Sequence, residues 1–173
     1  MIYIGIQTVL FLINLVQFRS KAELAGILRK ALEIEKGFEN LAQWEAYVQA
    51  KNEGFRNMIF TMISESEHHA TLVEEMLKRI GSGRTDQYEL RKQVFDFTSR
   101  EEKEIIGELA RTEKLALDTY INIKQGLLLS DVSSWIPESD RRFLIETLDI
   151  LIEEEMKHVE MTSKNIGKVE RIR

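Results

Sequence analysis

The chain has 173 residues and a single proline, Pro137, and this scarcity of chain breakers is what most limits its fold. Only nine glycines accompany that proline. Because glycine and proline mark most turns, a sequence with so few of them favours long helices over a sheet with many turns. The length suits one domain with a substantial core. We therefore predict an all-α protein.

Apolar residues recur at steps of three and four in four stretches, which is the spacing of one face of an α-helix. The predicted helices span residues 21–51, 55–80, 101–127 and 141–166, and residues 84–100 form a long polar connection between the second and third. Four long helices with one long connection are typical of a four-helix bundle with a crossover. The predicted bundle covers residues 21–166, followed by a basic tail at 167–173.

Residues 1–20 differ from the rest of the chain, because the first charged residue is Arg19 and most positions before it are apolar. This run reaches only the lower length limit of a membrane span, and polar side chains such as Asn14 interrupt it. We expect an extra apolar segment that packs on the domain or on a second subunit, with a weak membrane anchor through residues 1–18 as the alternative. A secretory signal would carry positive charge before the apolar run, so we expect a cytoplasmic protein.

The sequence contains no cysteine, which excludes disulfides, thiolate nucleophiles and every cysteine-ligated metal centre. Any metal ion would therefore be held by carboxylate and imidazole groups. The net charge is −5, which argues against nucleic acid as the main partner, because phosphate binding requires a basic face.

Each predicted helix carries a glutamate on its apolar face, where a charge is costly to bury. In chain order these glutamates are Glu35, Glu65, Glu113 and Glu155. A set of this kind is stable in a core only if positive charge lies between its members. Glu39, one turn after Glu35, is the alternative in the first helix.

Two of the three histidines follow a glutamate by three residues, in Glu65-x-x-His68 and Glu155-x-x-His158. This spacing places both side chains on one helix face, about 5–6 Å apart at Cβ, where one metal ion can bind both. His69 is the alternative to His68, because the i+4 position also faces Glu65. Two Glu-x-x-His helices and two helices with a single glutamate form the ligand set of di-iron and di-manganese carboxylate bundles.

Over about residues 21–165 the chain resembles the rubrerythrin branch of the ferritin-like superfamily. The resemblance rests on Glu35-Lys36 and Glu113-Lys114, which open similar segments, and on the two Glu-x-x-His motifs. It implies a pair of iron ions with terminal and bridging glutamates. The implied ligands are Glu35 and His68 for one ion, Glu113 and His158 for the other, and the bridging Glu65 and Glu155.

Some positions depart from the family. Rubrerythrins often carry a tyrosine seven residues after each terminal glutamate; Tyr120 fits after Glu113, whereas Ala42 stands after Glu35. We expect Tyr120 to hydrogen-bond a ligand carboxylate or the bound peroxide, as a catalytic residue. Ala116 occupies the position of an extra glutamate that lets one iron shift in some members. The cysteine-ligated iron domain that supplies electrons in typical rubrerythrins is absent, because the chain has no cysteine.

The resemblance implies a di-iron oxidoreductase that reduces hydrogen peroxide or dioxygen to water, with an external electron-transfer protein as reductant. Manganese is an alternative to iron, because mixed carboxylate and imidazole ligands suit both metals. Two other interpretations are an iron-binding or storage-related protein without turnover and a metal-free helical interaction module. We also expect a homodimer or a higher homo-oligomer.

Overall fold

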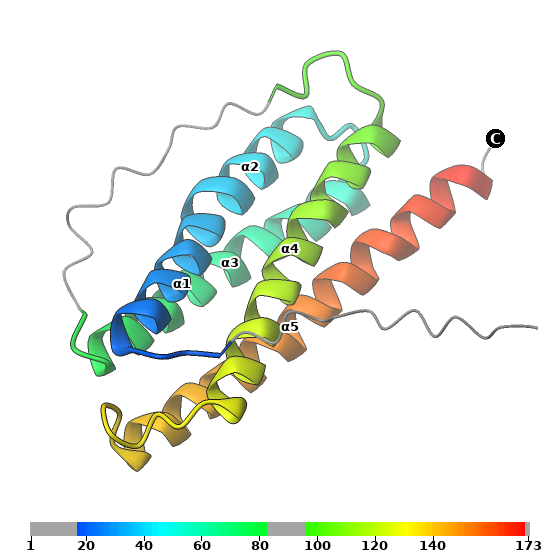
Figure 1. Cartoon of the computed structure of the whole chain (residues 1–173). Coiled ribbons are helices and arrows are strands. Elements are labelled where there is room, and N and C mark those ends of the chain that lie inside the picture. Colours follow the sequence, from blue (N-terminus) through cyan, green and yellow to red (C-terminus); the bar gives the residue numbers. More distant parts are fainter. Residues whose placement is uncertain (1–16, 83–95, 172–173) are drawn as a thin grey trace, which may run out of the picture.

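The computed structural model describes residues 17–82 and 96–171, with the side chains of 37–41 and 166–171 excepted, and this part of the chain is all-helical. The helices are α1 (Lys21–Glu33), η1 (Ile34–Glu39), α2 (Asn40–Gln49), α3 (Glu53–Arg79), α4 (Glu102–Leu129) and α5 (Glu138–Arg171). α1, η1 and α2 follow one another without a break (Figure 1). η1 is a π-helix. The helix predicted over residues 21–51 is thus one rod with a π-helical segment inside it.

Local signals explain where the helices begin and end. The side chains of Ser20 and Asn52 accept hydrogen bonds from the first turns of α1 and α3, which satisfies backbone donors that the helix leaves free. Gly81 follows α3 with a φ of 67°, a left-handed conformation that glycine adopts at little cost. Pro137 directly precedes α5, where its fixed φ favours the first turn.

The α1–η1–α2 rod packs against α3 and α4, and α5 packs against the same two helices. α4 and α5 lie side by side (Figure 1). The predicted connection over 84–100 and the predicted segment over 1–20 fall mostly outside the described residues, and α5 continues to Arg171. In the described ranges, no helix is long and apolar enough to cross a membrane.

Two apolar clusters fill the interior, and a band of buried polar side chains separates them. In α3, Ile59 and Ile63 belong to one cluster and Val73 to the other, with Ser66 and His69 between them. The α1–η1–α2 rod and α4 repeat this order, whereas α5 contributes to the cluster of Val73 and to the band. The buried polar band comprises Glu35, Gln43, Ser66, His69, Glu113, Glu155 and His158.

Candidate metal centre

α3 directs His69, and not His68, into the interior. Its buried stripe advances by three and four residues and comprises Met62, Ser66, His69, Val73 and Met76. His68 is exposed, and the side chain of Glu65 is 42% exposed beside the stripe. The structure therefore does not place the predicted ligands Glu65 and His68 together in the interior. α3 is rotated about its axis so that positions 66 and 69 point inward instead. His69 was the i+4 alternative in the sequence.

The other predicted glutamates lie inside, as expected from their apolar neighbours. Glu35, Glu113, Glu155 and His158 are each 1% exposed or less. The side chain of Glu39, the alternative to Glu35, lies outside the described residues. Four of the six predicted metal ligands thus meet in the band.

Two groups of potential metal ligands share one residue. His69 Nδ1 lies 2.8 Å from Glu155 Oε1 and 3.8 Å from Glu35 Oε2. His158 Nδ1 lies 3.0 Å from Glu113 Oε2 and 3.7 Å from Glu155 Oε2. Within each group the ligand atoms all lie within 4.8 Å of one another. Either group could hold a metal ion, and Glu155 directs one oxygen toward each histidine.

The outer nitrogen of each histidine contacts a further carboxylate. Nε2 of His69 lies 2.9 Å from Glu154 Oε2, and Nε2 of His158 lies 2.6 Å from Glu65 Oε2. A carboxylate in this position holds the ring orientation and increases the basicity of the other nitrogen, as in many metal sites. Glu65, predicted as a bridging ligand, thus lies behind His158. The sequence prediction did not include Glu154.

These contacts reveal a repeat between α3 and α5. In each helix a glutamate reaches the histidine of the other helix, and the next residue is buried. That buried residue stands three positions before its own histidine. The repeated segments are Glu65-Ser66-x-x-His69 and Glu154-Glu155-x-x-His158.

A second repeat relates the α1–η1–α2 rod to α4. The Tyr120 hydroxyl donates a hydrogen bond to Glu35, and Gln43 Nε2 donates one to Glu113 Oε1 at 3.2 Å. Tyr120 stands seven residues after Glu113, whereas Gln43 stands eight after Glu35, because a π-helical segment such as η1 inserts an extra residue. Gln43, and not Ala42, is therefore the counterpart of Tyr120, and both are positioning residues for buried glutamates.

The histidines balance the buried carboxylates electrostatically. Burial alone would lower the pKa of His158, but Glu113 and Glu155 outweigh burial and raise this pKa to about 11. The pKa of His69 is also raised, because Glu155 and Glu35 outweigh its burial. His158 is therefore a cation at neutral pH, and its ring contacts Glu65, Glu113 and Glu155.

Glu155 is held in its ionised form by the two histidines. Burial acts to raise the pKa of Glu155, but His158 and His69 outweigh it and hold the pKa below its ordinary value. Burial raises the pKa of Glu113 in spite of the opposing effect of His158. Both oxygens of Glu155 are buried, and among the described residues neither accepts a well-aligned hydrogen bond. A buried ionised carboxylate in this state requires nearby positive charge.

Comparisons of the chain with protein-family models, curated proteins and solved structures found no match. The resemblance to rubrerythrins thus stays a prediction from sequence motifs. The donor set nevertheless has a chemical meaning of its own. Imidazole nitrogens and carboxylate oxygens together suit iron, manganese and zinc, and geometry selects among these metals.

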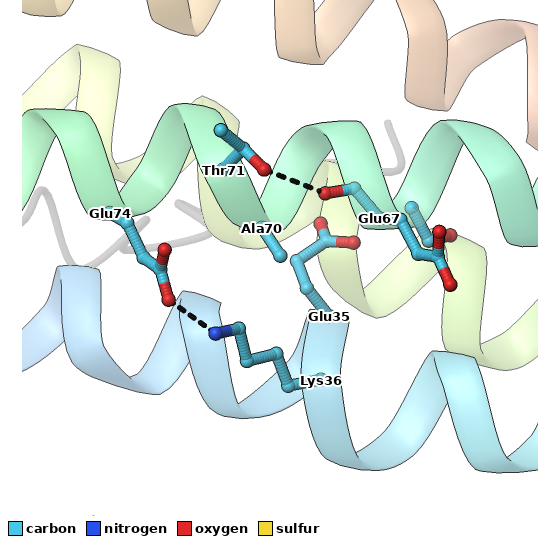
Figure 2. A pocket seen from close by; sticks show the side chains of 7 residues that line it. Glu35, Lys36, Glu67, Ala70, Thr71 and Glu74 are labelled. Carbon is cyan, nitrogen blue, oxygen red and sulfur yellow. Dashed lines mark hydrogen bonds and ion pairs between the residues drawn. The ribbon is translucent and has the colours of Figure 1, made fainter. Parts of the chain in front are cut away.

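A pocket of about 440 Å³ opens beside this cluster, between the first rod and α3 (Figure 2). Glu35 points toward α3, and Lys36 forms an ion pair with Glu74 (Figure 2). The lining residues are Glu35, Lys36, Ser66, Glu67, Ala70, Thr71 and Glu74. The pocket thus gives small molecules access to the ligand group that contains Glu35.

Proposed function

We propose that the chain binds two iron ions in the buried polar band and reduces hydrogen peroxide or dioxygen to water. The observation that carries this proposal is the position of Glu155, which belongs to both ligand groups and directs one oxygen toward each. A carboxylate of this kind can hold two metal ions close enough to act on one small substrate. In this proposal the helices form a ferritin-like four-helix bundle of rubrerythrin type.

Each ion would take one histidine and two glutamates. Glu35, His69 and Glu155 would hold one ion, and Glu113, Glu155 and His158 the other. The Nδ1 atoms of both histidines face the glutamates, and carboxylates behind the rings can accept the Nε2 protons. This leaves the inner nitrogens free to bind metal once they lose their protons.

Charge supports the presence of metal cations. Three glutamates are buried in the band, and the two histidines supply their positive charge as long as their rings are protonated. Metal ions can take over this role, because a bound divalent cation replaces the proton on each ligating ring. Because the buried glutamates already require positive charge nearby, the cluster favours the binding of metal cations.

The side chains around the glutamates would maintain the site during turnover. Two ferrous ions held by these ligands would supply one electron each, which together with two protons is what reduction of one hydrogen peroxide molecule to two water molecules requires. Reduction of dioxygen to water would require two further electrons and two further protons, with the electrons supplied by the external donor. Tyr120 and Gln43 hold Glu35 and Glu113 in place, and the pocket beside Glu35 admits a small substrate. The apolar clusters at both ends of the band limit the access of water. An external electron-transfer protein would return the electrons.

Metal content and peroxide reactivity together test this proposal. Protein purified without chelator should contain about two metal ions per chain by elemental analysis, with anomalous scattering at the iron edge in crystals. One equivalent of hydrogen peroxide should rapidly oxidise the Fe(II)-loaded protein under anaerobic conditions, as followed by absorption. E155Q should abolish binding of the ion pair. E153Q, at an exposed neighbour whose carboxylate pairs with Lys157, is the control and should bind normally.

Each alternative predicts a different result. Bound metal that peroxide does not oxidise would contradict the oxidoreductase function. Uptake well above two ions per chain would indicate iron storage. Protein that binds no metal under any of these conditions would be a metal-free helical module.

A further inference from the structure

We infer that Ser66 leaves a ligand position open between the two metal ions, and that a small monovalent anion from the pocket fills it. This inference rests on the proposed binding of two ions. It concerns the substrate class of that site, because hydroperoxide is itself a small monovalent anion.

The repeat between α3 and α5 shows what is missing. When the two helices are aligned on their histidines, Ser66 occupies the place of Glu155. Ser66 is 1% exposed, so its side chain points into the same buried band. Serine has a short, neutral side chain, and it cannot supply the second bridging carboxylate that a symmetric site would contain. α5 therefore contributes a bridging group and α3 does not.

The contacts of Ser66 locate the open position. Gln43 Nε2 donates to Ser66 Oγ at 3.0 Å and to Glu113 Oε1 at 3.2 Å, which ties Ser66 to one ligand group. Ser66 also lines the pocket together with Glu35 from the other group. Ser66 thus lies between the two groups, on the side that the pocket reaches. Glu155 comes from α5, which does not line this pocket.

Charge indicates which kind of molecule fits there. Three ionised buried glutamates leave one positive charge uncompensated when two divalent cations bind. The outer carboxylates of Glu65 and Glu154 are 42% and 29% exposed, so water screens much of their charge. One small monovalent anion would restore neutrality. In the pocket lining Lys36 balances the charge of Glu74, and Glu67 adds a negative charge that disfavours anions of higher charge, such as phosphate.

Azide is a suitable probe because it is a small monovalent anion that binds metal ions. The full chain is loaded with Co(II), the metal content is measured, and azide is titrated while the visible absorption of Co(II) is recorded. We expect one azide to bind per two cobalt ions. S66E adds the missing carboxylate; it should keep both cobalt ions and lower the azide affinity at least tenfold. S64E places the same residue at an exposed position of α3 and should bind azide normally.

Acetate provides a test that needs no variant. A free carboxylate can occupy the position of the missing side chain, so acetate should displace azide from the wild-type protein. Unchanged azide affinity in folded, cobalt-loaded S66E, or no displacement by acetate, would overturn the inference. Two bound cobalt ions without any response to azide would overturn it while leaving metal binding intact. Failure to bind cobalt at all would overturn the proposed metal site as well.

Discussion

Glu154 on α5 reaches the outer nitrogen of His69 on α3, with 2.9 Å between Oε2 and Nε2. Glu65 on α3 makes the reciprocal contact with His158 on α5, at 2.6 Å. Each histidine is therefore held between an outer carboxylate and the buried glutamates. This exchange of contacts fixes both ring orientations and directs both Nδ1 atoms toward Glu155.

Removing the charge of an outer carboxylate should weaken metal binding without abolishing it. We expect E65Q and E154Q each to lower metal affinity by roughly 10-fold to 100-fold, because the histidine loses its orienting partner. Competition with a chelating dye measures this change. E153Q alters an exposed carboxylate on α5, next to Glu154, and should bind metal as the wild type does. Equal affinities in all three variants would contradict the role of these contacts.

The adjacent histidines of α3 offer a matched pair of variants. H69N removes a buried inner ligand and should eliminate one of the two bound ions, whereas H68N changes an exposed side chain and should bind both. Elemental analysis after dialysis against metal-free buffer distinguishes them. The opposite result, with loss of metal only in H68N, would show that α3 presents its i+3 histidine.

Tyr120 should contribute to stability even without metal. Y120F removes the hydroxyl that donates to Glu35 in the core, and a buried charged acceptor that loses a donor typically costs about 1–3 kcal/mol. Urea unfolding of the metal-free protein should therefore give a free energy of unfolding lower by about this amount. Y47F removes a hydroxyl from a half-buried tyrosine outside the polar band and should change stability by less than about 0.5 kcal/mol. Similar losses in both variants would remove the special role of Tyr120.

The metal-free protein should become less stable as pH rises above neutrality. The pKa of His158 is raised from 6.5 to about 11, so its stabilising effect is complete below pH 6.5 and is lost as pH rises toward 11. Unfolding midpoints measured from pH 6 to pH 10 should fall steadily. H158N lacks the titrating ring, and its midpoint should depend less on pH over this range. A wild-type midpoint that stays constant would contradict the protonated state of His158.

Metal binding should stabilise the fold. At a free metal concentration about 100-fold above Kd, binding to the native state alone adds about 2.7 kcal/mol. For a domain of this size each kcal/mol raises Tm by roughly 2–4 °C. Chelation should therefore lower Tm by about 5–11 °C, as measured by circular dichroism. E155Q is the control, and chelator should leave its Tm unchanged.

The helices could be predicted to within a few residues, because the signals that start and stop them are local. Gly81 and Pro137 mark the ends of segments whose apolar spacing is clear. The burial of Glu113 and Glu155 could be predicted for a similar reason, since each interrupts an otherwise apolar stripe, and His158 could be predicted from its spacing of three residues after Glu155. These positions follow from helix geometry and the cost of burying charge.

The rotation of α3 could not be predicted in the same way. Positions i+3 and i+4 both lie on the side of a helix that faces residue i, so His68 and His69 are equivalent until packing fixes the helix. The packing of Met62, Val73 and Met76 in the interior selects His69. Ser66 gave no signal, because an uncharged residue on a buried stripe is ordinary. Glu154 becomes recognisable only after α3 and α5 are aligned on their correct histidines.

η1 affects how the sequence of the α1–η1–α2 rod aligns with that of α4. An alignment of the first rod with α4 needs a one-residue gap inside η1. Without that gap Ala42 stands opposite Tyr120, and every later position of α2 is offset by about 100° around the helix axis. Deleting a single residue from η1 would turn α2 by the same angle and move the Gln43 amide away from Glu113. An insertion in a helix backbone, rather than a substitution, thus decides which side chain reaches that carboxylate.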